Sequence, residues 1–291
     1  MTKILQSTYV GDDAWDRLQK SIRAGKTPFK YIDRLEIGFA TVNTSDPDNS
    51  RLEYVINEWP QPTRVTMTRD QAKYQNRDIE VIAQMDHAWR LAPLVADPRK
   101  AETRLDTFAA SIPKLLKQYN LQGIDFDWEF SGGGGVGKMT TDLASFLFTQ
   151  TRYYLNSDKD LNKPIMTITP DAEYPLKEAM DFDVLNKVFD GIIVQSYGRV
   201  YYIDNYLNNG HGVKPSLLYV GLCSEPGEFF PDDADISPYT KKVRENNLPG
   251  LYAWRVDNDD PDLAHQVPKY TITTKLTHYS RGHPPDPPLY P

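Results

Sequence analysis

The sequence contains a single cysteine, Cys223, and only five histidines among its 291 residues. One cysteine can form no disulfide within the chain and no cysteine zinc cluster. Cys223 lies in the apolar run LLYVGLCSE, where a small buried side chain is expected rather than a nucleophile. The histidines are scattered and lack the H-x-x-E-H type of spacing, so we predict no metal site and no bound cofactor.

Positive charge and long apolar runs are also scarce. The chain has 40 Asp and Glu against 33 Lys and Arg, and its formal net charge is −7. This balance argues against a nucleic-acid partner, because phosphate neutralisation requires a basic face. No run reaches the ~18 apolar residues of a membrane span, so no membrane partner is expected.

The N-terminal sequence MTKILQSTYVGDD lacks the apolar core of a signal peptide and enters a strand-like segment at once. As written, the sequence predicts a cytoplasmic protein. A signal that had been removed, or excision from a longer secreted protein, would leave the same sequence, so this alternative stays open.

Short apolar segments alternate with helical patterns along most of the chain. Strands are predicted at 3–10, 35–42, 79–85, 123–130, 165–170, 191–197, 217–222 and 250–256. Helices are predicted between them at 13–25, 69–77, 104–120, 140–156, 183–189 and 240–247. Parallel strands need such crossover connections, and eight β/α units in about 250 residues are typical of a (β/α)8 barrel. The sequence therefore predicts an α/β fold with a (β/α)8 TIM barrel, and an open doubly wound sheet is the alternative.

The alternation of strands and helices stops near residue 260. The stretch VPKYTITTKLTHYSRGHPPDPPLYP has one short alternating run and then a Pro-rich end. We therefore predict a single catalytic barrel over 1–260 and a short C-terminal extension over 261–291, packed on the surface or disordered.

The stretch GIDFDWEFSGGGGVGKMTTDL, residues 123–143, contains two patterns that predict different chemistry. Its second half nearly matches the phosphate-binding loop G-x-x-x-x-G-K-S/T through Gly132, Gly137 and Lys138. Met139 stands where that loop needs a hydroxyl side chain to bind magnesium. The strand before a phosphate-binding loop is usually apolar on both faces, and here it carries acids. A nucleotide site is therefore disfavoured.

The first half of this stretch places three acids on one face of the predicted strand. Side chains alternate along a strand, so Asp125, Asp127 and Glu129 share one face and the apolar residues between them share the other. Active sites of barrels lie at inward positions near the carboxyl ends of strands. Carboxyl groups ~6–7 Å apart repel one another, so the pKa of at least one should rise. A carboxylic acid that stays protonated is what cleavage of a glycosidic bond requires, whereas a solvated or cation-binding strand is the alternative.

The residues GIDFDWE resemble the D-G-x-D-x-D-x-E signature on the fourth strand of glycoside hydrolase family 18, which includes chitinases and endo-β-N-acetylglucosaminidases. The D-x-D-x-E core is complete at Asp125, Asp127 and Glu129, and Gln122 replaces the leading Asp. Trp128 is more similar to chitinases, because the endoglycosidases often carry another acid at that position.

Two later segments resemble the same family. IIVQSYGR, at the sixth predicted strand, is similar to the Q-x-Y-N motif of plant-type members through Gln195 and Tyr197, although Gly198 departs from it. GLYAWRVDND is similar to the last strand, whose Trp forms the floor of the −1 sugar subsite, here Trp254. The three motifs lie at the ends of the fourth, sixth and eighth predicted strands, so the resemblance extends over most of the chain.

One motif of the family is absent. The third strand usually ends in S-x-G-G, and this sequence has VIAQMDHAW instead, with Gln84, Asp86 and His87 near that place. His87 and Trp89 are therefore candidate substrate-binding residues in the cleft.

The resemblance implies a retaining, substrate-assisted hydrolysis, in which the substrate's own N-acetyl group attacks the anomeric carbon. Glu129 would be the acid and base, and Asp127 would hold the N-acetyl N–H. The other implied site residues are Asp125, which would share a proton with Asp127, Tyr197, which would orient the acetamido oxygen, and the substrate-binding residues Trp254 and Gln195.

The predicted partner is an oligosaccharide or polysaccharide that contains N-acetylglucosamine, and the first candidate reaction is cleavage of β-1,4 linkages in chitin or chito-oligosaccharides. One alternative is an endo-β-N-acetylglucosaminidase that cuts the chitobiose core of N-glycans. The other is a non-catalytic, chitin-binding, lectin-like relative, although such proteins typically lack the acid at the position of Glu129.

Overall fold

The computed structural model describes residues 2–9, 12–24, 29–54, 62–129, 139–170, 181–207, 212–227, 230–231, 234–259, 261–262, 267–268 and 270–281. Within these residues, eight parallel strands form a closed barrel, because β1 pairs with both β9 and β2. The barrel strands are β1 (Lys3–Tyr9), β2 (Arg34–Asn43), β4 (Glu80–Met85), β5 (Gly123–Trp128), β6 (Ile165–Pro170), β7 (Gly191–Val194), β8 (Leu218–Cys223) and β9 (Gly250–Trp254). The predicted (β/α)8 barrel is thus confirmed.

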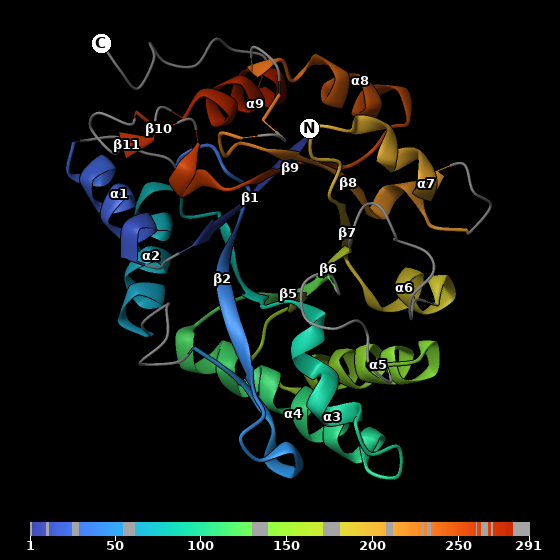
Figure 1. Cartoon of the computed structure of the whole chain (residues 1–291). Helices are drawn as coiled ribbons and strands as arrows, with labels where there is room; N and C mark the ends of the chain where they lie inside the picture. Colours follow the sequence, from blue (N-terminus) through green and yellow to red (C-terminus); the bar gives the residue numbers. More distant parts are fainter. Residues whose placement is uncertain are drawn as a thin grey trace.

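Helices surround the barrel on its outside (Figure 1). They are α1 (Asp12–Arg23), α2 (Pro62–Gln75), α3 (Ala92–Val95), α4 (Ala101–Tyr119), α5 (Thr141–Ser157), α6 (Phe182–Val188), α7 (Asp204–Leu207), α8 (Ser237–Glu245) and α9 (Thr271–Arg281). A short strand, β3 (Arg51–Glu53), runs antiparallel to the end of β2, and β10 (Pro261–Asp262) pairs with β11 (Val267–Pro268). Among the described helices, none combines the length and the hydropathy that crossing a bilayer requires.

Strand β5 shows how the sequence positions the acidic face. Its apolar residues point outward, where Phe126 and Trp128 pack edge-on against Phe148 of α5 at centroid distances of 5.5 and 4.7 Å. The alternating residues Asp125 and Asp127 therefore face the barrel interior, and both are buried. The alternation predicted from the sequence is confirmed here.

Strands β5 and β7 are among those that end earlier than predicted. β5 ends at Trp128 and β7 ends at Val194, so Glu129, Gln195 and Tyr197 follow the strands instead of lying within them. Leaving the ladder lets the chain turn, which brings these side chains to the carboxyl-end mouth of the barrel.

The structure describes part of the predicted C-terminal extension. The predicted extension, 261–291, contains helix α9, which packs against β1 and β9. Tyr270, Ile272 and Leu276 are fully buried in the main hydrophobic core. Helix α9 therefore follows the last strand as the other helices follow theirs. The Pro-rich end, 282–291, lies outside the described residues, as does the glycine segment 132–135.

The sequence of α9, TITTKLTHYSR, is rich in threonine, a β-branched residue that favours strands, and this explains why the helix was missed. The start of α9 is fixed by a residue that lies outside the helix. Asp259 accepts the backbone N–H groups of Ile272 and Thr273 at 3.0 and 2.7 Å. A carboxylate at the N-terminus of a helix satisfies otherwise unpaired backbone donors, so a tertiary contact defines this helix more than its local sequence does.

Candidate active site

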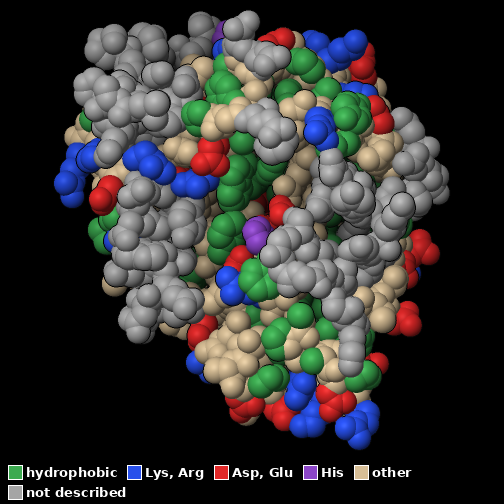
Figure 2. All heavy atoms as spheres, viewed as in Figure 1, with side chains coloured by type: hydrophobic (Ala, Val, Ile, Leu, Met, Phe, Trp, Pro, Cys, Tyr) green, Lys and Arg blue, Asp and Glu red, His purple; other side chains and the backbone are tan. Residues whose placement is uncertain are grey.

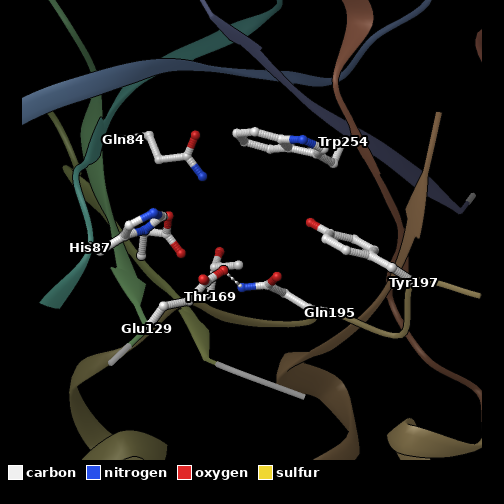
Figure 3. A pocket seen from close by; sticks show the side chains of 8 residues that line it. Gln84, His87, Glu129, Thr169, Gln195, Tyr197 and Trp254 are labelled. Carbon is white, nitrogen blue, oxygen red and sulfur yellow. Dashed lines mark hydrogen bonds and ion pairs between the residues drawn. The ribbon is translucent and has the colours of Figure 1, made fainter. Parts of the chain in front are cut away.

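A cavity of about 170 Å³ opens at the carboxyl ends of the barrel strands. Figure 2 shows a hollow in the centre of this face, with a histidine and acidic side chains in it. The cavity is lined by residues from five strands or the segments directly after them, namely Gln84, His87, Asp127, Glu129, Thr169, Gln195, Tyr197 and Trp254 (Figure 3). Six of the eight predicted site residues meet here; Asp125 lies beneath the cavity, and Trp89 lies outside its lining.

Asp125 is completely buried and held by the neighbouring strand β6. Its Oδ1 accepts a hydrogen bond from Thr167 at 2.7 Å, and its Oδ2 accepts one from Thr169 at 2.9 Å. Gln84 of β4 donates to Oδ2 at 3.5 Å. Burial raises the pKa of Asp125 to about 6, although these hydrogen bonds act in the opposite direction.

Asp127 is 3% exposed and has two different oxygen environments. Its Oδ2 contacts Nδ1 of His87 at 2.9 Å, whereas its Oδ1 is buried and has no hydrogen-bond partner within the part of the chain that the structure describes. Burial and then the charge of Glu129 raise the pKa of Asp127 well above its usual range, and the contact with His87 lowers it. The same contact raises the pKa of His87 to about 9.

Glu129 is half-buried at the rim of the acidic face, where Gln195 donates its amide N–H to Oε1 of Glu129. Gln195 was predicted to bind substrate. In the structure its amide orients the carboxyl group of Glu129 while lining the same cavity.

Tyr197 lies across the cavity from His87, with its hydroxyl pointing inward (Figure 3). Its ring packs against Leu5, Ile193, Tyr219 and Tyr252. Burial raises the pKa of Tyr197 well above its usual range, so its phenol remains a hydrogen-bond donor. Glycine at 221 makes room for this ring, because a Cβ there would lie 2.5 Å from the Val194 carbonyl and 3.3 Å from Tyr197.

Trp254 spans the upper side of the cavity in Figure 3. Its ring stacks on Phe39 with a centroid distance of 5.7 Å and an interplanar angle of 27°. Phe39 lies where the β2–β4 register shifts, and such an irregularity can redirect a side chain. Phe39 therefore reaches both Trp254 and His87, a role that the sequence pattern did not indicate.

Trp89 does not line the described cavity. Its ring lies under the guanidinium group of Arg90, whose Cζ is 4.2 Å from the ring centroid.

The sequence patterns did not lead us to predict Thr167 and Thr169 as site residues. Their alternation in IMTITP places them on the inward face of β6, and this signal could have identified them.

His87, Asp127 and Glu129 offer potential ligand atoms within 4.8 Å of one another, a donor set that a cation could use. The geometry within this trio is that of a salt bridge, since Nδ1 of His87 contacts the Asp127 carboxylate directly. The trio thus combines an imidazole, a carboxylate and a second carboxyl group at the wall of one small cavity.

Comparison with known proteins places this arrangement in a family. The chain is similar in structure to a chitinase-like agglutinin from Robinia pseudoacacia (TM-score 0.68, 13% identity, covering 94% of this chain and 98% of that one). It is also similar to a glycoside hydrolase family 18 N-acetylglucosaminidase from Paenibacillus barengoltzii (0.73, 12%, 96% and 100%). A third similar structure is a plant class V chitinase mutant from Cycas revoluta in complex with (GlcNAc)3 (0.68, 11%, 96% and 100%).

At these identities the structural likeness concerns the fold. The sequence profile described as "Glycosyl hydrolases family 18" matches residues 8–225, which include every predicted site residue except Trp254. The resemblance predicted from the three motifs is therefore confirmed, and the chain belongs to glycosyl hydrolase family 18.

Proposed function

We propose that this protein hydrolyses β-1,4 linkages beside N-acetylglucosamine by a retaining, substrate-assisted mechanism. The observation that carries this proposal is the unpartnered Oδ1 of Asp127, buried in the cavity wall next to Glu129. A buried acceptor without a donor costs about 1–3 kcal/mol. The N–H of an N-acetyl group would supply the missing donor, so this oxygen fits an N-acetylated sugar better than an unmodified one.

The spacing of the carboxyl groups supports retention of configuration. Oxygens of Asp127 and Glu129 lie within 4.8 Å of each other. An inverting enzyme keeps its two carboxyl groups roughly 6.5–9.5 Å apart, because a water molecule must fit between one of them and the sugar. The close approach of one oxygen from each group therefore supports retention with an internal nucleophile.

In the first step, Glu129 donates its proton to the glycosidic oxygen as the bond from that oxygen to the anomeric carbon breaks. The carbonyl oxygen of the substrate's N-acetyl group forms a new bond to the anomeric carbon, which gives an oxazolinium ion. Asp127 accepts the N–H of this ion and stabilises its positive charge through the buried carboxylate. Tyr197 donates to the acetamido oxygen and aligns it for attack.

In the second step, Glu129 acts as the base. It removes a proton from water while the water oxygen attacks the anomeric carbon and opens the oxazolinium ring, which regenerates the N-acetyl group. Gln195 keeps Glu129 in place during both steps, and Trp254 packs on the apolar face of the sugar ring.

The proposal is tested by incubating the protein with chito-oligosaccharides and following the products by NMR. We expect the β-anomer as the first product, and a Glu129→Gln variant that loses hydrolysis by a factor of about 10²–10⁴ while keeping its thermal stability and its affinity for the oligosaccharide. An α-anomer as the first product, or an unchanged rate in the variant, would refute the mechanism.

Adding a high-mannose glycoprotein to this assay as a second substrate separates the two other candidate functions. Preferential cleavage of a high-mannose glycoprotein would identify an endo-β-N-acetylglucosaminidase. Binding of chito-oligosaccharides without hydrolysis by the wild-type protein would identify a lectin-like relative, a class represented among similar structures by the Robinia agglutinin. The presence of Glu129, with its carboxyl group oriented by Gln195, favours the hydrolase.

A further inference from the structure

The segment after β4 brings a histidine onto the acidic face of the barrel. β4 and β5 pair in parallel with Gln84 opposite Asp125, so the chain that leaves β4 passes beside Asp127. His87 is held there from two sides. Its backbone N–H donates to Oδ1 of Asp86 at 2.8 Å, and its ring lies 5.8 Å from the ring of Phe39.

Each carboxyl group of the acidic face has its shortest hydrogen bonds to a different strand or adjoining segment. The hydroxyls of β6 hold Asp125, His87 after β4 holds Asp127, and Gln195 after β7 holds Glu129. Among the described residues, no hydrogen bond joins any two of these three carboxyl groups. Asp127 is therefore oriented by His87 and not by the carboxyl group behind it.

The proposed reaction requires one particular distribution of protons. Glu129 must carry a proton when Asp127 is ionised, although the two groups lie within 4.8 Å. Asp127 is 3% exposed and Glu129 is half-buried, so burial alone would place the proton on Asp127. A cation beside Asp127 opposes this preference, because it stabilises the ionised form of its direct partner most strongly.

We propose that His87 is a positioning residue that favours the ionised form of Asp127 and directs its second carboxylate oxygen, Oδ1, toward the substrate. The inference rests on the proposed function and deepens it. It also gives a role to the segment that replaces the third-strand motif of the family, since His87 lies at that place in the chain.

The charges around His87 agree with this role. Asp127 and Glu129 face it from β5 and the segment after it, and Asp86 faces it from its own segment. Phe39 of β2 is uncharged, and Arg90 is paired with Asp86 at 2.8 Å. Among the described residues, the charged groups that raise the pKa of His87 are all acidic. The side chain of His87 is 33% exposed, so its imidazolium also keeps part of its hydration.

The test is the dependence of kcat/KM on pH in a His87→Gln variant, with a chito-oligosaccharide as substrate. Glutamine can donate one hydrogen bond to Asp127 but carries no charge. Loss of the cation raises the pKa of Asp127, so we expect the acidic limb of the profile to move to higher pH by about one unit, with a loss of about tenfold in kcat/KM near pH 5. A purely structural role would lower the rate equally at every pH.

Arg90→Gln is the matched control, because it removes one positive charge from the same segment without touching Asp127. Its acidic limb should coincide with that of the wild type. An unshifted acidic limb in His87→Gln, or an equal shift in both variants, would overturn the inference.

A second measurement does not depend on catalysis. NMR titration of the His87 ring should give a pKa of about 9 in the wild type and a lower value in Asp127→Asn, because the bond to Asp127 is the largest cause of the elevation. A wild-type His87 that titrates near its ordinary value would overturn the ion pair. A protein that shows the pair but hydrolyses no chito-oligosaccharide would instead refute the proposed function.

Discussion

Two pairs of buried aspartates belong to different parts of the barrel, and their surroundings differ. Asp125 and Asp127 belong to β5, whereas Asp257 and Asp259 directly follow β9; all four are at most 3% exposed. Asp257 accepts from Arg255 at 2.9 Å and from Thr8 at 3.2 Å. Asp259 accepts two backbone N–H groups of α9 and the hydroxyl of Thr273.

The difference between the pairs separates a structural role from a chemical one. The aspartates after β9 accept from guanidinium and backbone N–H donors, so their charges stabilise the fold. Among the described residues, Asp125 accepts from hydroxyl and amide donors alone, and Asp127 keeps one buried oxygen without a donor in a cavity. An equally buried acid with an open acceptor is poised for a ligand, and its removal should affect activity more than folding.

The largest expected effect is that of Asp127→Asn on hydrolysis. The variant keeps the shape of the side chain but removes the negative charge that would stabilise the oxazolinium ion. We expect kcat for chito-oligosaccharides to fall by a factor of about 10²–10³, as happens when one preorganised electrostatic group is lost. Steady-state kinetics measure this change.

Thermal unfolding of the same variant provides the control for Asp127→Asn. The variant removes a buried charge but also the ion pair with His87, so its Tm should stay close to that of the wild type. A large fall in Tm together with full activity in the remaining folded protein would place Asp127 in the structural class and contradict the comparison.

For Asp259→Ala we expect a loss of stability and not of activity, because the substitution leaves the backbone donors of α9 without their carboxylate. We expect a loss of about 3–5 kcal/mol in the free energy of unfolding, because a buried, charged acceptor is removed from its donors. Chemical denaturation measures this loss, and the folded fraction should keep its specific activity.

Asp181→Ala is the matched control for Asp259→Ala. Asp181 also accepts N–H groups at the start of a helix, α6, from Asp183 and Val184, but in an exposed setting. Its loss should cost only about 1 kcal/mol. Equal losses in the two variants would show that burial of Asp259 adds nothing to its cap.

The same contrast explains which features the sequence could reveal. The barrel and the acidic face of β5 were predictable, since both depend on alternation within a few residues. The start of α9 was not, because its cap, Asp259, is 13 residues from Ile272 and its own sequence favours strands. The contact of His87 with Asp127 spans 40 residues and depends on the register between β4 and β5, which no local pattern specifies.

Asp125 is intermediate between the two classes, and its substitution should change the stability less than that of Asp259. Its pKa of about 6 in the folded protein exceeds the usual value of 3.8, so folding favours the protonated form. The stability that this group contributes is fully present below pH 3.8 and is lost as the pH rises through 6.

The stability of the Asp125→Asn variant has no such pH dependence, and the hydroxyls of Thr167 and Thr169 can rotate to pair with the amide of the variant. The Tm of the variant relative to the wild type should therefore rise between pH 4 and pH 7, with a total change on the order of 2 kcal/mol in the free energy of unfolding. A difference in Tm that stays constant over this range would mean that Asp125 remains ionised throughout, and it would move Asp125 into the class of Asp257 and Asp259.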